Sequence, residues 1–115
     1  MSVILHITTR EQWEHAKPAG IYYSPTLETE GFIHCSTPQQ IIQTANLFFK
    51  NQKGLVIFCI QEEKVKSEIR YEAVENKHFP HIYGPLNLDA VIKIIDFEPK
   101  ENGKFDLPEA LANKI

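Results

Sequence analysis

The chain has 115 residues, of which 43% are hydrophobic and 23% are charged, and its formal net charge is −3 at pH 7. These values are typical of one soluble globular domain, which we place at 1–115 with a core over roughly 3–97 and a C-terminal tail over 98–115. The slightly acidic balance offers no basic footprint for nucleic acid, so we do not expect a nucleic-acid partner.

The first residues lack the basic region and the long apolar stretch of a secretory signal, and no run is long enough to span a bilayer. We therefore expect no association with a membrane. Two cysteines, Cys35 and Cys59, lie in apolar segments. Without a secretory signal they are expected to be reduced and buried, which predicts a cytoplasmic protein.

The first element is predicted to be a short strand, because residues 3–5 form an apolar run. We expect it to end at Thr8–Thr9. Thr8 and Glu11 have the spacing of a capping box, which predicts a short helix that stops at residues 17–20.

Residues 21–31 start with aromatic side chains and continue with turn-forming residues. This composition predicts a loop that crosses the surface. In such a loop Tyr22 or Tyr23 is placed to cover a cleft as a lid.

A second strand is predicted over 31–36, directly before a helix. Thr37 is a favoured N-cap, Pro38 occupies the favoured first helical position, and Gln40 completes a capping box. The expected apolar stripe of this helix consists of Ile41, Ile42, Ala45, Phe48 and Phe49. Backbone N–H groups at the start of such a helix can bind an anion or an oxygen-rich ligand.

The second half of the chain is dominated by strand signals. Residues 55–60 form a nearly continuous apolar run, typical of a central strand covered on both faces. We further expect an edge strand over 69–72, a turn over 75–80, a long strand over 88–97 and one helical turn over 109–112. Helices early and strands late indicate an α+β fold.

Three segments repeat one pattern, in which a histidine is followed two residues later by a hydroxyl side chain. They are His6–Thr8, His34–Ser36 and His81–Tyr83. Residues i and i+2 of a strand point to the same side, so each histidine shares a face with its hydroxyl. Polar pairs at strand ends, facing away from an apolar layer, predict a cleft.

The three histidines also allow a metal site, although their spacing matches no local metal motif. A nucleophile pair of His34 with Cys35 is not favoured, because adjacent strand residues point to opposite faces. Ser36 is either a polar partner of His34 or a helix cap. Glu72 is the nearest acid for general acid–base work, or simply a surface carboxylate.

Three segments of the chain resemble the small bacterial proteins of domain of unknown function family 952. These segments are Leu5–Thr8, Glu28–Thr37 and Phe79–Leu86. The resemblance implies an α+β fold similar to the ADP-ribosyltransferase catalytic core. That fold consists of two small antiparallel or mixed sheets with two short helices, and it binds NAD in a cleft between the sheets.

The resemblance also implies residue roles. His6 matches the histidine that contacts the ribose of the nicotinamide half, and His34 matches a position whose ring packs on nicotinamide. These two are the candidate catalytic residues. The candidate ligand-binding residues are Thr8, Tyr22, Tyr23, Ser36, His81 and Tyr83.

One departure from that pattern bears on catalysis. The third motif of those transferases carries a glutamate that stabilises the transition state, whereas residues 81–86 contain no acid. The histidine pattern instead resembles RNA 2′-phosphotransferases, which need arginines to grip phosphate, including one just before the first-strand histidine. Here that position is Leu5, and the chain has only Arg10 and Arg70.

Three functional hypotheses follow. The first is an NAD-using transferase or glycohydrolase that acts on a small molecule, with NAD as the cofactor and no metal. The second is a non-catalytic module that binds NAD or a related nucleotide. The third is a metal-dependent hydrolase that uses His6, His34 and His81.

Overall fold

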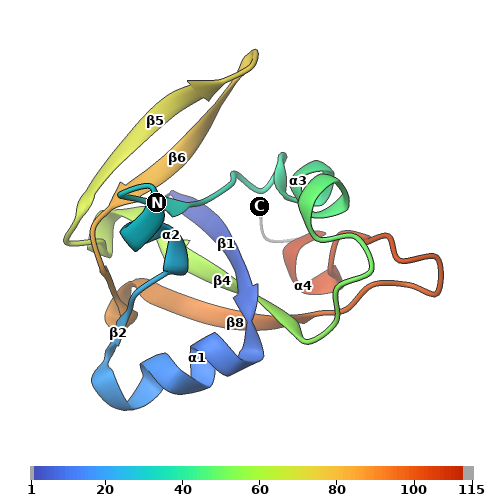
Figure 1. Ribbon diagram of the computed structural model, residues 1–115, viewed down its shortest axis with the longest axis horizontal. Coiled ribbons are helices and arrows are strands. Elements are labelled where there is room, and N and C mark those ends of the chain that lie inside the picture. The colour runs from blue at the N-terminus through green and yellow to red at the C-terminus, as the bar shows by residue number, and fades with distance from the viewer. Residues whose placement is uncertain (1, 113–115) are drawn as a thin grey trace.

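The protein is described by a computed structural model that covers residues 2–112 (Figure 1). The strands are β1 (Val3–Thr9), β2 (Ile21–Tyr22), β3 (Ile33–His34), β4 (Leu55–Gln61), β5 (Glu68–Val74), β6 (Lys77–Tyr83), β7 (Leu86–Asn87) and β8 (Val91–Phe97). The α-helices are α1 (Arg10–Ala16), α2 (Pro25–Thr29), α3 (Ile41–Phe48) and α4 (Glu109–Ala112). The predicted α+β class is confirmed.

The strands form three antiparallel sheets within the described residues, where the sequence had led us to expect two. One sheet has the order β1-β4-β8, a second has the order β3-β6-β5, and β2 pairs with β7 in a small third sheet. The central place of β4 and the edge place of β5 agree with the sequence predictions. The third sheet forms because residues 21–22 are extended and bond to residues 86–87.

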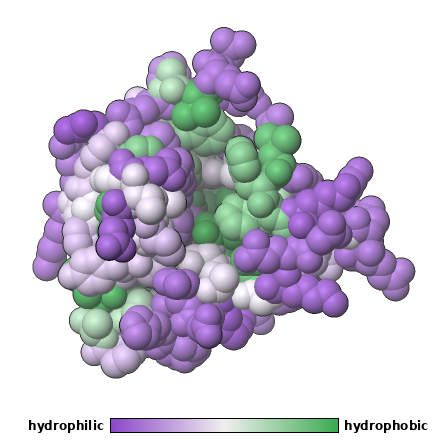
Figure 2. Space-filling model, viewed as in Figure 1, coloured by the Kyte–Doolittle hydropathy of each residue, from purple (hydrophilic) through white to green (hydrophobic). Residues whose placement is uncertain are grey.

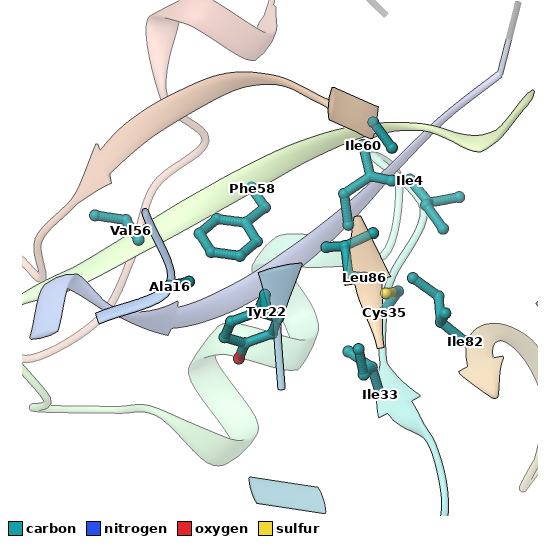
Figure 3. Close-up of a cluster of buried hydrophobic side chains, with 11 residues drawn as sticks. Ile4, Ala16, Tyr22, Ile33, Cys35, Val56, Phe58, Ile60, Ile82 and Leu86 are labelled. Atoms are coloured by element: carbon teal, nitrogen blue, oxygen red, sulfur yellow. The ribbon is translucent and has the colours of Figure 1, made fainter. Parts of the chain in front are cut away.

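Two apolar cores lie on the two faces of the β1-β4-β8 sheet. One core joins this sheet to β3 and β6, and Figure 3 shows Phe58 of β4 packed beside Tyr22, whose hydroxyl points away from the apolar cluster. The other core holds Leu5, α3 and the C-terminal segment around Phe105. Every residue from 55 to 60 is buried, which explains the unbroken apolar run.

A single β-bridge connects the chain after β3 to the free edge of β1. The backbone N–H of Leu5 donates to the carbonyl of Ser36 over 2.8 Å, and the N–H of Ser36 donates to the carbonyl of Leu5 over 2.7 Å. The β3-β6-β5 sheet therefore meets β1 at this point. The two larger sheets diverge from this junction, as the ribbon of Figure 1 shows.

Several local predictions are corrected. Thr9, not Thr8, caps α1, because its hydroxyl accepts from the N–H of Gln12 over 3.0 Å while Thr8 is buried in the sheet. Residues 21–31 are not a plain loop but contain β2 and α2, whose N-cap is Ser24. Residues 77–80 belong to β6 rather than to a turn, because pairing with β5 extends them.

Helix α3 begins three residues later than the sequence predicted. Half of the capping box is present, since the side chain of Gln40 accepts from the N–H of Thr37 over 2.9 Å, but residues 38–40 form a turn. The predicted apolar stripe holds for Ile41 and Ala45, which are buried. It fails for Phe48, which is 75% exposed.

Two further findings concern the described residues as a whole. Cys35 and Cys59 are free and buried, and burial raises the pKa of both thiols, that of Cys59 to about 11. None of the helices within residues 2–112 has the length and apolar character that crossing a membrane requires.

Candidate functional site

A cleft of about 960 Å³ opens between the edge of β1, helix α3 and the β5–β6 hairpin. We call it the central cleft. Figure 2 shows the hollow on this face, with hydrophobic surface beside it on the side of α3. Its lining comes from β1 and β3, from α2 and α3, and from the hairpin, and includes Thr8, Ser36, Leu47, Phe79 and His81.

The floor of the central cleft is a buried chain of three hydrogen-bonded side chains. His6 Nδ1 lies 2.6 Å from the backbone oxygen of His34, and His6 Nε2 lies 2.7 Å from the hydroxyl of Tyr22. That hydroxyl also lies 3.0 Å from Oγ1 of Thr8. A carbonyl oxygen can only accept, so the proton of a neutral His6 is on Nδ1 and Nε2 accepts from Tyr22.

His6 is held in its uncharged form by this position. Burial lowers the pKa of His6 to about 4, although the hydrogen bond to the His34 carbonyl acts in the opposite direction. The ring also packs against Phe58, with 5.9 Å between centroids. The expectation that His6 faces away from an apolar layer is therefore wrong, because both faces of the β1-β4-β8 sheet are covered.

One wall of the central cleft carries titratable side chains from neighbouring strands. His34 of β3 and His81 of β6 lie opposite each other in this wall, and Arg70 of β5 continues the cross-strand row outside the cleft lining. His34 Nε2 is 3.0 Å from a carboxylate oxygen of Glu30. The rings of His34 and His81 meet edge to face, 5.2 Å apart.

His81 is anchored by an acid on the adjacent strand. Its Nδ1 lies 2.8 Å from Oε1 of Glu72, and the Tyr83 hydroxyl donates to the same oxygen over 2.5 Å. These hydrogen bonds lower the pKa of Glu72 and raise that of Tyr83. Because an ionised carboxylate only accepts, Nδ1 of His81 donates, and the Nε2 lone pair remains on a neutral ring.

The Nε2 atom of His81 is not fully buried. Within residues 2–112, Nε2 has no hydrogen-bond partner. Every fully buried side-chain nitrogen or oxygen in this range does have a partner, so Nε2 keeps contact with solvent. The residue as a whole is 4% exposed and is one of those that line the central cleft. Phe32 stacks on the ring with 4.2 Å between centroids and fixes its plane.

The opposite wall is apolar and unusually exposed. Leu47 and Phe48 of α3 are 67% and 75% exposed, and both line the central cleft. The hairpin faces this wall and is tied to the start of α3, because Lys77 Nζ donates to Oε1 of Gln43 over 2.6 Å. An amphipathic organic ligand suits a cleft with one apolar and one polar wall.

The structure places six of the eight predicted site residues at the central cleft, namely His6, Thr8, Tyr22, His34, Ser36 and His81. The lid role is wrong for Tyr22, which is 1% exposed and belongs to the floor. Tyr23 is exposed but lines a neighbouring cavity, and Tyr83 lies behind His81 as a partner of Glu72. Ser36 caps no helix, since its hydroxyl donates to Thr44 over 3.5 Å.

Sequence reasoning undervalued Glu72, which it treated mainly as a surface carboxylate. Glu72 lies on the neighbouring strand within hydrogen-bond distance of His81, and the available signal was the alternation Arg70–Glu72 on a predicted strand. The three histidines do not form a metal site, because within residues 2–112 no group of three or more His, Cys, Asp or Glu side chains could hold an ion. His6 already uses both ring nitrogens.

Comparisons with known proteins place this architecture in a family. The chain is similar to protein CC0527 from Caulobacter crescentus, whose crystal structure has a TM-score of 0.88 at 31% identity and covers 96% of this chain and 99% of that one. The crystal structure of a double mutant of CC0527 gives the same values. The solution NMR structure of CC0527 has a TM-score of 0.83 at 32% identity, with 97% and 98% of the two chains covered.

No curated protein matches the chain at a significant level. The family model described as "Protein of unknown function (DUF952)" matches residues 7–94, a stretch that contains His34, Glu72 and His81. This match spans most of the chain and includes the strands from β2 to β7. The chain therefore belongs to the DUF952 family.

Proposed function

We propose that this protein is an NAD-using glycohydrolase or transferase with an ADP-ribosyltransferase-like fold. In this proposal the central cleft binds a nucleotide such as NAD and its N-glycosidic bond is broken there. The observation that carries the proposal is the pair of Glu72 and His81. It supplies an oriented base at the cleft wall, where the third motif by itself has no acid.

The chemistry needs few groups because the leaving group is cationic. When water attacks C1′ of the nicotinamide riboside half, the glycosidic C–N electron pair moves onto the ring nitrogen and neutralises its charge. The leaving nicotinamide therefore needs no proton donor. The water forms the new C–O bond and its proton passes to Nε2 of His81, as a general base requires. In a transferase the hydroxyl of an acceptor replaces the water.

Glu72 acts through His81 and is a positioning residue. Its carboxylate holds Nδ1–H and stabilises the imidazolium that forms when Nε2 takes the proton. Both ring nitrogens of His6 have partners within the protein, so in this proposal His6 makes no direct hydrogen bond to the ribose. It orients Tyr22 and thereby Thr8, whose side chain lines the cleft.

The test is nicotinamide release from NAD, followed by chromatography, with binding measured in parallel by calorimetry. His81→Gln should lower kcat about 100-fold or more, the usual contribution of general base catalysis, while NAD affinity changes little. Glu72→Gln should lower kcat less and move the acidic limb of the pH–rate profile to lower pH, because the imidazolium loses its counter-charge. The matched control is His78→Gln on the same strand, since His78 is exposed and does not line the cleft.

Binding without any nicotinamide release, in the presence of water or of small alcohols as acceptors, would make the protein a nucleotide-binding module. The absence of NAD binding would overturn the proposal altogether. Equal kcat values for the His81→Gln variant and the unchanged protein would show that His81 is not the general base.

A further inference from the structure

We infer that the central cleft recognises the pyridinium riboside part of its ligand and leaves the phosphates outside. This inference rests on the proposed function and names the part of the nucleotide that provides affinity. It follows from the charges, the aromatic surface and the placement of the arginines around the cleft.

The charges that line the central cleft favour a cation. Among the described residues the charged lining consists of the carboxylates of Glu11, Glu30 and Glu75 and the single ammonium of Lys77. The ammonium donates to Gln43 over 2.6 Å and is therefore committed to the hairpin–α3 contact. Three carboxylates against one ammonium leave this lining with a net negative charge, and the carboxylate of Glu30 also lies 3.0 Å from His34 Nε2. A negative potential attracts a positively charged ring and repels phosphate.

Both arginines of the chain lie away from the central cleft. Arg10, the first residue of α1, forms a salt bridge with Asp96 of β8. Arg70 donates from Nε to Glu68 over 3.0 Å, and its guanidinium lies 4.3 Å from the centroid of the Tyr83 ring. Neither side chain lines the cleft, so the bidentate groups that grip phosphate in many proteins are missing from its lining.

The apolar and aromatic lining gives a flat cation a place to bind. Phe48 lies on α3, and Phe79 shares a face of β6 with His81, two residues further along the strand. Cations are attracted to the faces of aromatic rings, and a pyridinium ring also stacks on them. A pyridinium riboside therefore matches the surface and the charge of the cleft, whereas a pyrophosphate matches neither.

The experiment compares four ligands by calorimetry with the full chain, namely nicotinamide riboside, its reduced form, NAD and ADP-ribose. The reduced riboside has nearly the same shape but no positive charge. We expect the oxidised riboside to bind about tenfold or more tightly than the reduced form, and no more weakly than NAD, because charge and ring stacking act together. ADP-ribose, which lacks the pyridinium ring, should bind at least about tenfold more weakly than NAD.

A matched pair of variants locates the effect. Glu30→Gln keeps the shape of a cleft-lining side chain but removes its charge. It should weaken binding of the oxidised riboside about fivefold, the effect of one partly exposed charge, and leave the affinity for the reduced riboside unchanged. Glu28→Gln removes a charge from helix α2, which Glu30 directly follows, at a position outside the central cleft. This variant should change the affinity of neither the oxidised nor the reduced riboside.

The outcomes separate this inference from the proposed function. Tight binding of NAD and ADP-ribose with weak binding of the riboside would overturn the inference and leave the proposed function standing. Equal affinity for the oxidised and reduced ribosides would also overturn it. If none of the four ligands binds, the proposed function fails and the inference fails with it.

Discussion

His6 Nδ1 and the backbone oxygen of His34 are 2.6 Å apart, although 28 residues separate them in the chain. This hydrogen bond crosses the junction between the two larger sheets, next to the β-bridge of Leu5 with Ser36. It fixes the tautomer of His6 and directs Nε2 at Tyr22. One buried imidazole thus connects the junction of the sheets to the floor of the central cleft.

Replacing His6 by alanine should lower the free energy of unfolding by about 3 kcal/mol. The change leaves a cavity beside Phe58 and deprives the buried Tyr22 hydroxyl of a partner. Urea denaturation monitored by tryptophan fluorescence measures the effect. The control His15→Ala changes an exposed residue on α1 and should cost less than about 0.5 kcal/mol. Equal midpoints for the two variants would contradict the structural role of His6.

The protein should lose stability between about pH 6.5 and pH 4 because of His6. Its pKa is lowered from 6.5 to about 4 by burial, so below pH 6.5 the unfolded state binds a proton that the folded state does not. The free energy of unfolding therefore falls as the pH falls through this window, by about 3 kcal/mol in total. Urea titrations at a series of pH values measure the slope.

The variant His6→Gln isolates this contribution, since it keeps polar groups at the position but cannot titrate. The difference in free energy of unfolding between the unchanged protein and His6→Gln should decrease with falling pH across the same window. Protonation of the carboxylates affects both proteins equally and cancels in this difference. A difference that stays constant from pH 7 to pH 4 would show that His6 titrates normally in the folded protein.

Tyr83→Phe should raise the pKa of Glu72 towards its ordinary value. The Tyr83 hydroxyl donates to Oε1 of Glu72 over 2.5 Å, and this hydrogen bond is the largest cause of the lowered pKa of that carboxyl. The carboxyl carbon shift of Glu72, followed by NMR against pH, reports the change. Tyr71→Phe is the control, because Tyr71 donates to Glu62 instead and should leave Glu72 unchanged.

Gly84→Ala should destabilise the protein by about 2 kcal/mol. Gly84 has φ +145°, and a Cβ there would lie 2.5 Å from Oγ of Ser67. That oxygen cannot move freely, because it donates to the carbonyl of Pro85 over 2.7 Å. Thermal unfolding checks the prediction. Gly20→Ala, also at positive φ but with open space around it, should cost only about 1 kcal/mol.

A double-mutant cycle tests the cause of the Gly84 effect. In a Ser67→Ala background the clashing oxygen is gone, so the additional cost of Gly84→Ala should shrink. If the cost is the same in both backgrounds, backbone strain alone accounts for it and contact with Ser67 does not.

Local signals in the sequence were sufficient to predict the strands of the β1-β4-β8 sheet. Residues 55–60 are apolar at every position because β4 is covered on both faces, and such a run has few other interpretations. The placement of His6 with Thr8 on β1 and of His81 with Tyr83 on β6 was also readable from the two-residue repeat, whereas Ser36 lies beyond the end of β3. His6 and Thr8 accordingly meet at the cleft floor.

Helix boundaries were less well predicted, because capping residues compete. Thr8 and Thr9 are both suitable N-caps by composition. In the structure Thr9, the last residue of β1, caps the helix, whereas the buried side chain of Thr8 bonds to the Tyr22 hydroxyl. In the same way, Phe48 has the spacing of a core residue of α3. Its exposure depends on how the helix is rotated against the sheet, which the sequence of the helix does not contain.

The sequence by itself determined the α+β class, the central strand and the three histidines of the central cleft, since these follow from short-range periodicity. Only the tertiary structure decided how those residues act together. The approach of Glu72 to His81 depends on the register of β5 with β6, and the burial of Tyr22 depends on its position over Phe58. Strand register and packing arise from contacts between distant segments, so no local pattern along the chain can specify them.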